Sequence, residues 1–200
     1  MKKEIAKYMK RLCDSGLTTS LGGNISCLSK EGIFVTPSGI DKYELLPDDI
    51  TKLSFDGQVI DGKNDPSIES MMHVKIYEMR EDIGAIVHAH PLFTTLLSAS
   101  NEKINIAYTA EALKNLKYIE YSIFQLMGSQ ELANVVSSAA RNANIVVMKN
   151  HGAVTLGKTL LEAFYRMELL ENAAKMSFYS RFLDVNELAN QEKECYNLTR

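Results

Sequence analysis

The chain has 200 residues, 46% of them hydrophobic and 24% charged, which is typical of a globular protein with a sizeable core. A formal net charge of −3 leaves no basic stripe for a phosphate backbone, so we expect no nucleic-acid partner. No apolar stretch approaches the roughly 18 residues of a membrane span, so we also expect no membrane partner.

The chain begins with a predicted amphipathic helix and carries no leader-like apolar segment. Its apolar residues recur at helical spacing, at Ile5, Tyr8, Met9 and Leu12. The cysteines, Cys13, Cys27 and Cys195, are odd in number and form no CxxC pair. This usage indicates free thiols in a reducing cytoplasm.

Short strands and small-residue loops follow the first helix. Two strands are predicted over 25–29 and 32–39, after the paired glycines Gly22 and Gly23. A hairpin is predicted over 50–60, with Asp56 and Gly57 as its two-residue turn.

A helix is predicted over 64–80. Asp65 can cap it and Pro66 suits its first turn. Its predicted buried stripe consists of Ile68, Met72, Ile76 and Met79.

The second half alternates strands with helices. A run of branched aliphatic residues predicts a strand that ends in His88 and His90 and is closed by Pro91. A helix over 128–143 is opened by Ser129, with Glu131 in its first turn. The remaining predicted segments are a helix over 92–100, strands over 118–124 and 144–157 (the latter with a tight turn), a helix over about 159–182 that buries Ala163, Met167, Leu170 and Ala174, and a polar tail.

This order of elements favours an α/β fold. Strands paired as hairpins and interleaved with helices predict a mainly antiparallel central sheet covered by helices on both faces. No repeat, low-complexity segment or linker divides the chain, so we expect a single domain over 1–200, with a C-terminal tail from about residue 183.

The histidines suggest a metal site. His88 and His90 are two residues apart on a strand, so both imidazoles face the same side, with the bite that Zn²⁺ requires. His151 also follows an apolar strand, next to a glycine that permits a close backbone approach. Three imidazoles with an open position are the catalytic arrangement of zinc. The alternative is that each histidine is bonded to the backbone in the core or in a turn.

Spacing alone leaves the third ligand open. His73 lies four residues after Glu69 on one predicted helix, so the two side chains share a face. His73 could therefore be a ligand and His151 the structural histidine. Glu69 could simply complement the helix dipole.

Three loops of small residues suggest a phosphate pocket. They are Gly22–Asn24, Thr36–Gly39 and Asp65–Ser67, and each offers backbone N–H groups with a hydroxyl or amide. Ser67 is predicted to lie at a helix N-terminus, which favours an anion. None of them has the spacing of a P-loop or of a dinucleotide fingerprint.

Taken in order, the segments "GGNIS", "VTPSG", "DPSIE", "VHAHP", "GSQELA" and "NHGAVTLG" resemble the class II aldolase/adducin family, from about Thr18 to Met176. The chain looks most like the small sugar-phosphate aldolases of the L-fuculose-1-phosphate type. The resemblance implies a mainly antiparallel sheet between helical layers (a three-layer α/β/α fold). It also implies a homotetramer with active sites at subunit interfaces.

The resemblance also implies roles for residues of this chain. His88, His90 and His151 match the zinc-binding histidines, and His73 matches a histidine that is not a ligand. Glu69 matches the carboxylate that completes the metal shell and then acts as acid/base. The phosphate-binding positions match Gly23, Asn24, Ser38, Gly39 and Ser67.

There are departures from the family pattern. Ile68 stands where the phosphate segment has a second serine, which removes a donor. Tyr108 and Tyr196 are the nearest candidates for substrate tyrosines, but neither is in register.

The implied activity is that of a metal-dependent aldolase. A phosphorylated ketose would be cleaved to dihydroxyacetone phosphate and an aldehyde, with one Zn²⁺ per subunit as Lewis acid, or Mn²⁺ or Co²⁺ in its place. Glu69 would move the proton, which requires a pKa near the working pH.

Three rivals of the aldolase interpretation can be weighed against these residues. Sugar-phosphate 4-epimerases of the family typically have Asp at the position of Glu69. Methylthioribulose-1-phosphate dehydratases use another glutamate, for which Glu111 is the nearest candidate. A non-enzymatic adducin-like module lacks the metal histidines, whereas this chain has all three.

Overall fold

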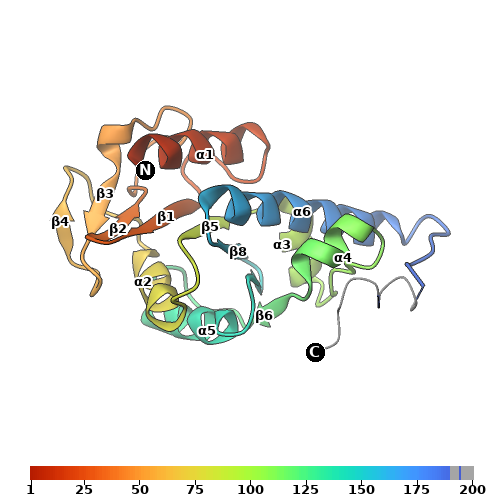
Figure 1. The fold of residues 1–200 in the computed structure, drawn as a ribbon. Coiled ribbons are helices and arrows are strands. Elements are labelled where there is room, and N and C mark those ends of the chain that lie inside the picture. Colours follow the sequence, from red (N-terminus) through yellow and green to blue (C-terminus); the bar gives the residue numbers. More distant parts are fainter. Residues whose placement is uncertain (190–193, 195–200) are drawn as a thin grey trace.

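The computed structural model describes residues 1–189 and residue 194. Among these residues, eight strands form one sheet in the order β4-β3-β2-β1-β5-β8-β7-β6 (Figure 1). The strands are β1 Asn24–Ser29, β2 Gly32–Val35, β3 Thr51–Leu53, β4 Val59–Asp61, β5 Ala85–Ala89, β6 Glu120–Ser122, β7 Ile145–Met148 and β8 Gly152–Gly157. The helices are α1 Lys2–Asp14, α2 Ser70–Met79, α3 Leu92–Ala99, α4 Ala110–Leu116, α5 Gln130–Ala140 and α6 Leu160–Tyr179, with a 3₁₀ turn at Pro47–Asp49.

The sheet is mixed, which corrects the mainly antiparallel sheet expected from the sequence. Strand β6 runs parallel to β7, while the other neighbouring pairs are antiparallel. The cause is α5, which lies between β6 and β7 in the chain. A helical crossover returns the chain to the starting end of the sheet, so the two strands it joins run parallel.

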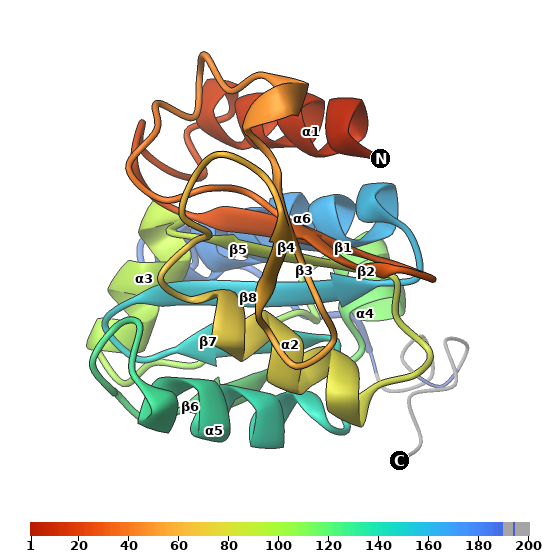
Figure 2. The same ribbon diagram turned by 90° about the vertical axis from the view of Figure 1, so that its left-hand side faces the viewer.

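Two apolar clusters pack against the two faces of the sheet. Alternate residues of β5 belong to different clusters, because side chains of a strand point alternately to its two faces. Ala85, Val87 and Ala89 pack with residues of α1, α3, α4 and α6, whereas Ile86 packs with α2 and α5. Figure 2 shows α1 and α2 on opposite sides of the sheet. Strand β5 is buried along its whole length.

Most predicted helices are confirmed. The four predicted apolar residues of α1 and the four of α6 are all buried. Ser129 caps α5 by accepting a hydrogen bond from the backbone N–H of Leu132. Helix α4 was not predicted, although Thr109 caps it in the same way, by accepting from the N–H of Ala112.

The prediction for 64–80 is wrong at its start. Helix α2 begins at Ser70 with Glu69 at the N-cap position, so Asp65 is not the cap, and Ser67 precedes the helix instead of opening it. Residues 65–67 are instead held alongside 36–38. The N–H of Ser38 donates to the carbonyl of Asp65, and the N–H of Ser67 to that of Thr36.

Two residues of the predicted buried stripe are exposed. Ile68, outside the helix, is 57% exposed, and Met79 at the other end is 40% exposed. The hairpin turn is also longer than predicted. The N–H of Ser54 donates to the carbonyl of Gln58, so three residues form the turn, with Gly57 at φ 87°.

The remaining expectations concern the thiols, the tail and membranes. Cys13 and Cys27 are free and buried, while Cys195 lies outside the described residues. Residues 183–189 form neither helix nor strand. No described helix is long and apolar enough to cross a membrane.

Candidate metal centre and substrate cavity

His88 is placed by the central strand of the sheet. It lies on β5 between β1 and β8, with its side chain fully buried. Its Nδ1 lies 3.0 Å from the carbonyl oxygen of Ala153 on β8. Because a carbonyl can only accept, Nδ1 carries the proton, and neutral His88 has a lone pair on Nε2.

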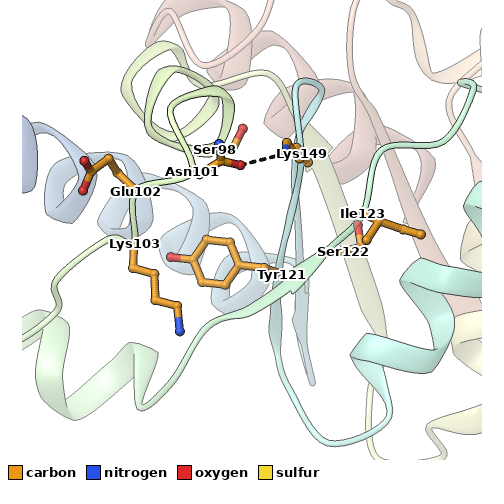
Figure 3. A pocket seen from close by; sticks show the side chains of 8 residues that line it. All are labelled: Ser98, Asn101, Glu102, Lys103, Tyr121, Ser122, Ile123 and Lys149. Carbon is orange, nitrogen blue, oxygen red and sulfur yellow. Dashed lines mark hydrogen bonds between the residues drawn. The ribbon is translucent and has the colours of Figure 1, made fainter.

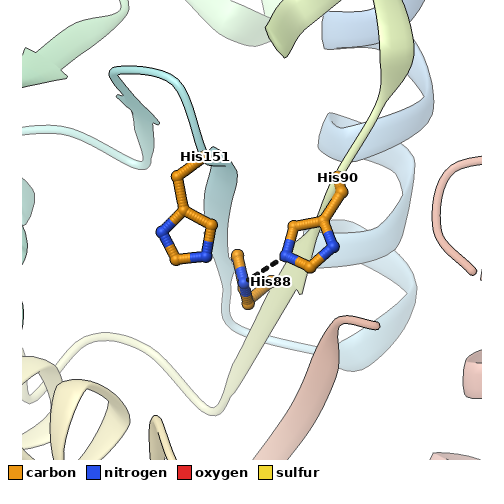
Figure 4. A group of neighbouring side chains, drawn as sticks. All are labelled: His88, His90 and His151. Carbon is orange, nitrogen blue, oxygen red and sulfur yellow. Dashed lines mark hydrogen bonds between the residues drawn. The ribbon is translucent and has the colours of Figure 1, made fainter. Parts of the chain in front are cut away.

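His90 and His151 bring two more rings to the same place. His90 lies just beyond the end of β5, with its Nε2 3.0 Å from Nε2 of His88. His151 immediately precedes β8, in the turn from β7. One ring nitrogen from each of the three lies within 4.8 Å of the others, and Figure 4 shows the rings turned toward one another. The sequence-based grouping of these three histidines is confirmed as a spatial cluster.

Glycine permits this close approach. A Cβ on Gly152, next to His151, would lie 2.3 Å from the carbonyl oxygen of Ala89 and 2.9 Å from the ring of His90. Gly23 has φ +68°, and a Cβ there would lie 2.8 Å from the carbonyl oxygen of His88. Both positions therefore exclude a larger residue without a backbone shift.

Glu69 approaches the histidines from the N-cap position of α2. Its side chain is buried, with Oε2 3.0 Å from Nε2 of His88 and Oε1 3.3 Å from Nε2 of His151. The side-chain amide of Asn24 donates to Oε2 at 3.0 Å. Oε1 has no hydrogen-bond partner among the described residues.

These contacts fit a metal ion. Around Nε2 of His88, an oxygen of Glu69 and a nitrogen of His90 both approach to 3.0 Å. One proton can bridge only one such pair of electron-rich atoms, whereas a cation can bind all of them. Three imidazole nitrogens with one carboxylate oxygen are a donor set that Zn²⁺ accepts.

Burial and charge set the protonation of the group. Burial lowers the pKa of His90 to about 3 and that of His151 to about 4. Burial opposes the charging of Glu69, but the positive charge that His88 carries when it is protonated, together with its hydrogen bond, outweighs burial and holds the pKa of Glu69 well below its usual range. Burial likewise opposes protonation of His88, yet the charge of Glu69 raises the pKa of His88. His90 and His151 are thus neutral at pH 7, the form that binds metals.

A cavity of about 320 Å³ opens onto this group. The three small-residue loops meet at its wall, with Gly23, Asn24, Ser38 and Ser67 among the lining residues. Gly39 is not one of them, and the amide nitrogen of Asn24 is already bonded to Glu69. The full lining is Thr19, Leu21, Gly22, Gly23, Asn24, Pro37, Ser38, Lys42, Ser67, Ile68, Glu69, His90, Met127 and His151.

Sequence reasoning missed several lining residues. Leu21 and Met127 are exposed apolar side chains at this cavity, and Lys42 is a buried charged residue in its lining. Leu21 directly precedes the recognised segment "GGN", and this adjacency could have identified it. Met127 comes from the segment between β6 and α5 and has no such marker.

Other candidate residues lie elsewhere. His73 is fully buried and does not line the cavity. Glu111 on α4 is exposed and accepts a hydrogen bond from the hydroxyl of Tyr165 on α6 at 2.8 Å, so within this chain it does not reach the histidines. Tyr108 does not line the cavity, and Tyr196 lies outside the described residues.

A second cavity, of about 250 Å³, shares no lining residue with the first. Figure 3 shows Lys149 bonded across it to Asn101, with Nζ donating to Oδ1 at 2.6 Å. Its lining contains no histidine and consists of Ser98, Asn101, Glu102, Lys103, Tyr121, Ser122, Ile123 and Lys149. Among the described residues, the one group of three or more neighbouring side chains that could hold a metal ion is His88, His90 and His151.

Fold and site together define an α/β protein with a three-histidine group suited to a metal ion beside a cavity. The chain belongs to the class II aldolase and adducin family. The sequence model of that family, described as the class II aldolase and adducin N-terminal domain, matches residues 3–178.

Individual relatives agree with this assignment. The chain is 39% identical to an L-fuculose phosphate aldolase of Methanocaldococcus jannaschii over 176 residues, covering 88% of this chain and 94% of the relative. It is 34% identical to a 5-deoxy-D-ribulose 1-phosphate aldolase of Bacillus thuringiensis over 203 residues, covering 100% and 93%. A solved L-fuculose 1-phosphate aldolase matches the fold with a TM-score of 0.86 at 32% identity, covering 98% of this chain and 93% of that one.

Proposed function

We propose that this chain is a metal-dependent aldolase that cleaves a phosphorylated ketose, similar to L-fuculose 1-phosphate, to dihydroxyacetone phosphate and an aldehyde. One observation carries the proposal: His90, His151 and Glu69, which cluster with His88, line the cavity at which three small-residue loops also meet. The names of the relatives, which are aldolases of L-fuculose phosphate and of 5-deoxy-D-ribulose 1-phosphate, support the same substrate class.

In this proposal the three histidines and Glu69 hold the metal. Neutral imidazoles and one carboxylate favour Zn²⁺, one per subunit, with Mn²⁺ or Co²⁺ as substitutes. When bound, the ion supplies a Lewis acid for negative charge that develops on the substrate oxygens. Gly23, Asn24, Ser38, Gly39 and Ser67 bind the phosphate with neutral donors.

Glu69 moves the proton in this proposal. Its carboxylate rests against His88, His151 and Asn24, which favour the ionised form. Leaving these partners for a partly apolar environment raises the pKa of a carboxylate and makes it a better base. Glu69 then exchanges a proton with the carbon of dihydroxyacetone phosphate next to the carbonyl.

The proposal extends to the whole molecule. The chain forms a single three-layer α/β/α domain with a C-terminal tail from about residue 183, assembles as a homotetramer with active sites at subunit interfaces, and works in the cytoplasm. Support for an interface comes from the exposed apolar side chains next to the cavity and in the segment before α5: Leu21, Ile68, Ile123, Phe124, Leu126 and Met127.

The test is a screen of phosphorylated ketoses for metal-dependent release of dihydroxyacetone phosphate. The set contains L-fuculose 1-phosphate, 5-deoxy-D-ribulose 1-phosphate and the unphosphorylated sugars. We expect release from at least one sugar phosphate, loss of activity with a chelator, and recovery on addition of Zn²⁺. No release from any sugar phosphate with the metal-loaded protein would overturn the proposal.

A further inference from the structure

Lys42 is a buried lysine at the wall of the metal-site cavity. Its side chain is 2% exposed, and Nζ donates to the backbone carbonyl of Pro37. No carboxylate of the described residues forms an ion pair with it. Lysine is almost never fully buried unless its charge is paired, so the partner of this ammonium needs an explanation.

The cavity supplies few charges of its own. Apart from histidine, its lining residues contain one formal positive charge, on Lys42, and one negative charge, on Glu69. A phosphate monoester carries a charge of about −1.5 to −2 at pH 7. The small-residue loops offer neutral donors, and Ile68 offers no side-chain donor at all. A cation in the wall would offset the cost of bringing that charge out of water.

Lys42 is also fixed relative to the three loops. Its backbone N–H donates to the carbonyl of Ser20 at 2.8 Å, which ties it to the loop before Gly22. Its ammonium holds Pro37, and the segment 36–38 is in turn bonded to 65–67. The charge is therefore held where the three loops meet, without the ordering cost of a long surface side chain.

We propose that the ammonium of Lys42 is the counter-charge for the phosphate group in this cavity. This proposal deepens the proposed function. It rests on that function only for the identity of the phosphorylated molecule, a ketose phosphate. Burial lowers the pKa of Lys42, and a bound anion favours the charged form of the lysine.

The first test measures binding of inorganic phosphate to the metal-loaded full-length chain by isothermal titration calorimetry. Lys42→Met removes the charge and the donor, whereas Lys42→Gln removes the charge and keeps a donor for Pro37. If the charge matters, both variants lose about tenfold or more in affinity, and Lys42→Arg loses less. If Lys42 only holds the Pro37 carbonyl, Lys42→Gln binds phosphate like wild type and Lys42→Met does not, and the proposal is wrong.

Lys75→Gln is the matched control, since it removes one positive charge on α2 outside the cavity. It should bind phosphate like wild type. Metal content is measured for every variant, and phosphate affinities are compared at equal metal content. Any phosphate bound directly to the ion then contributes equally to each value. The affinity of wild type should also fall more steeply with ionic strength than that of Lys42→Met.

The outcomes separate this proposal from the aldolase assignment. If phosphate binding depends on Lys42 but no ketose is cleaved, the counter-charge stands and the aldolase assignment fails. If wild type does not bind phosphate, or if both uncharged variants bind phosphate as tightly as wild type does, the counter-charge proposal is wrong even in an active aldolase. In an active enzyme, Lys42→Met should raise KM for the sugar phosphate.

Discussion

Nδ1 of His73 lies 2.7 Å from Oγ of Ser26, on β1, the strand next to the one that carries His88. The same hydroxyl lies 2.9 Å from the hydroxyl of Tyr77. His73 therefore joins α2 to the sheet through a buried hydrogen-bonded group. Its imidazole is bonded to the sheet and does not line the cavity, although its spacing from Glu69 suits a metal ligand equally well.

We predict that His73→Ala keeps the metal, whereas His151→Ala loses most of it. Loss of a partner outside the ligand shell typically costs metal sites about 10–100-fold in affinity, and loss of a ligand should cost at least as much. His88→Ala and His90→Ala should behave like His151→Ala. Metal content by elemental analysis of the folded variants checks this, and the reverse pattern would make the ligand assignment wrong.

His73 should also make the stability of the protein depend on pH. Burial lowers the pKa of His73 from 6.5 to about 3. Below pH 6.5 the unfolded chain binds a proton that the folded chain does not, so stability is full above that pH and falls as the pH drops toward 3. The slope for one such group reaches about 1.4 kcal/mol per pH unit.

The measurement is denaturant unfolding at pH 7 and pH 5, at one protein concentration, for wild type and His73→Gln. Between the two pH values, wild type should lose more stability than the variant. Acid effects on the other histidines are common to both proteins and cancel in this comparison. Equal losses would show that His73 is not held neutral by the fold.

Glu69→Gln tests the acid/base role. The variant keeps the size of the side chain and can still bond to its neighbours, but it cannot take up a proton. We expect it to fold, assemble and bind metal through three histidines, while exchange of the C–H proton of dihydroxyacetone phosphate with deuterated solvent falls by about 10²–10⁴-fold. This exchange needs no aldehyde partner and is followed by NMR. Exchange at the wild-type rate would redirect attention to Glu111.

Light scattering tests the assembly. A homotetramer has a mass four times the 22.4 kDa of the chain. We expect that mass at micromolar concentration, and partial dissociation on introducing a charge at Leu126, which is 70% exposed. A species with the mass of a single chain at all concentrations would contradict the assembly.

Periodicity and capping predicted the elements that are decided locally. The apolar stripes of α1 and α6 and the cap at Ser129 follow from residue spacing alone. The start of α2 could not be predicted in this way. Pro66 suits a first helical turn, but the long-range pairing with 36–38 holds 65–67 outside the helix, and a turn at 68–69 then leads into α2.

The site shows the same division. His88 and His90 could be paired from alternation along one strand, whereas the choice between His73 and His151 depended on the family resemblance. Lys42 was missed because a lysine in a polar loop has no periodic pattern, and its burial arises only when the loops at 20, 37 and 66 come together. Such contacts between distant segments are not readable from one sequence.

The two outer strands of the sheet, β4 and β6, are each three residues long. A long free edge would offer a row of unpaired N–H and C=O groups to another chain, which is a common route to aggregation. Lys2 and Asp61 add an ion pair on β4, at 3.3 Å. The sheet is therefore poorly suited to recruiting further strands, and a concentrated solution of this protein should resist fibril formation.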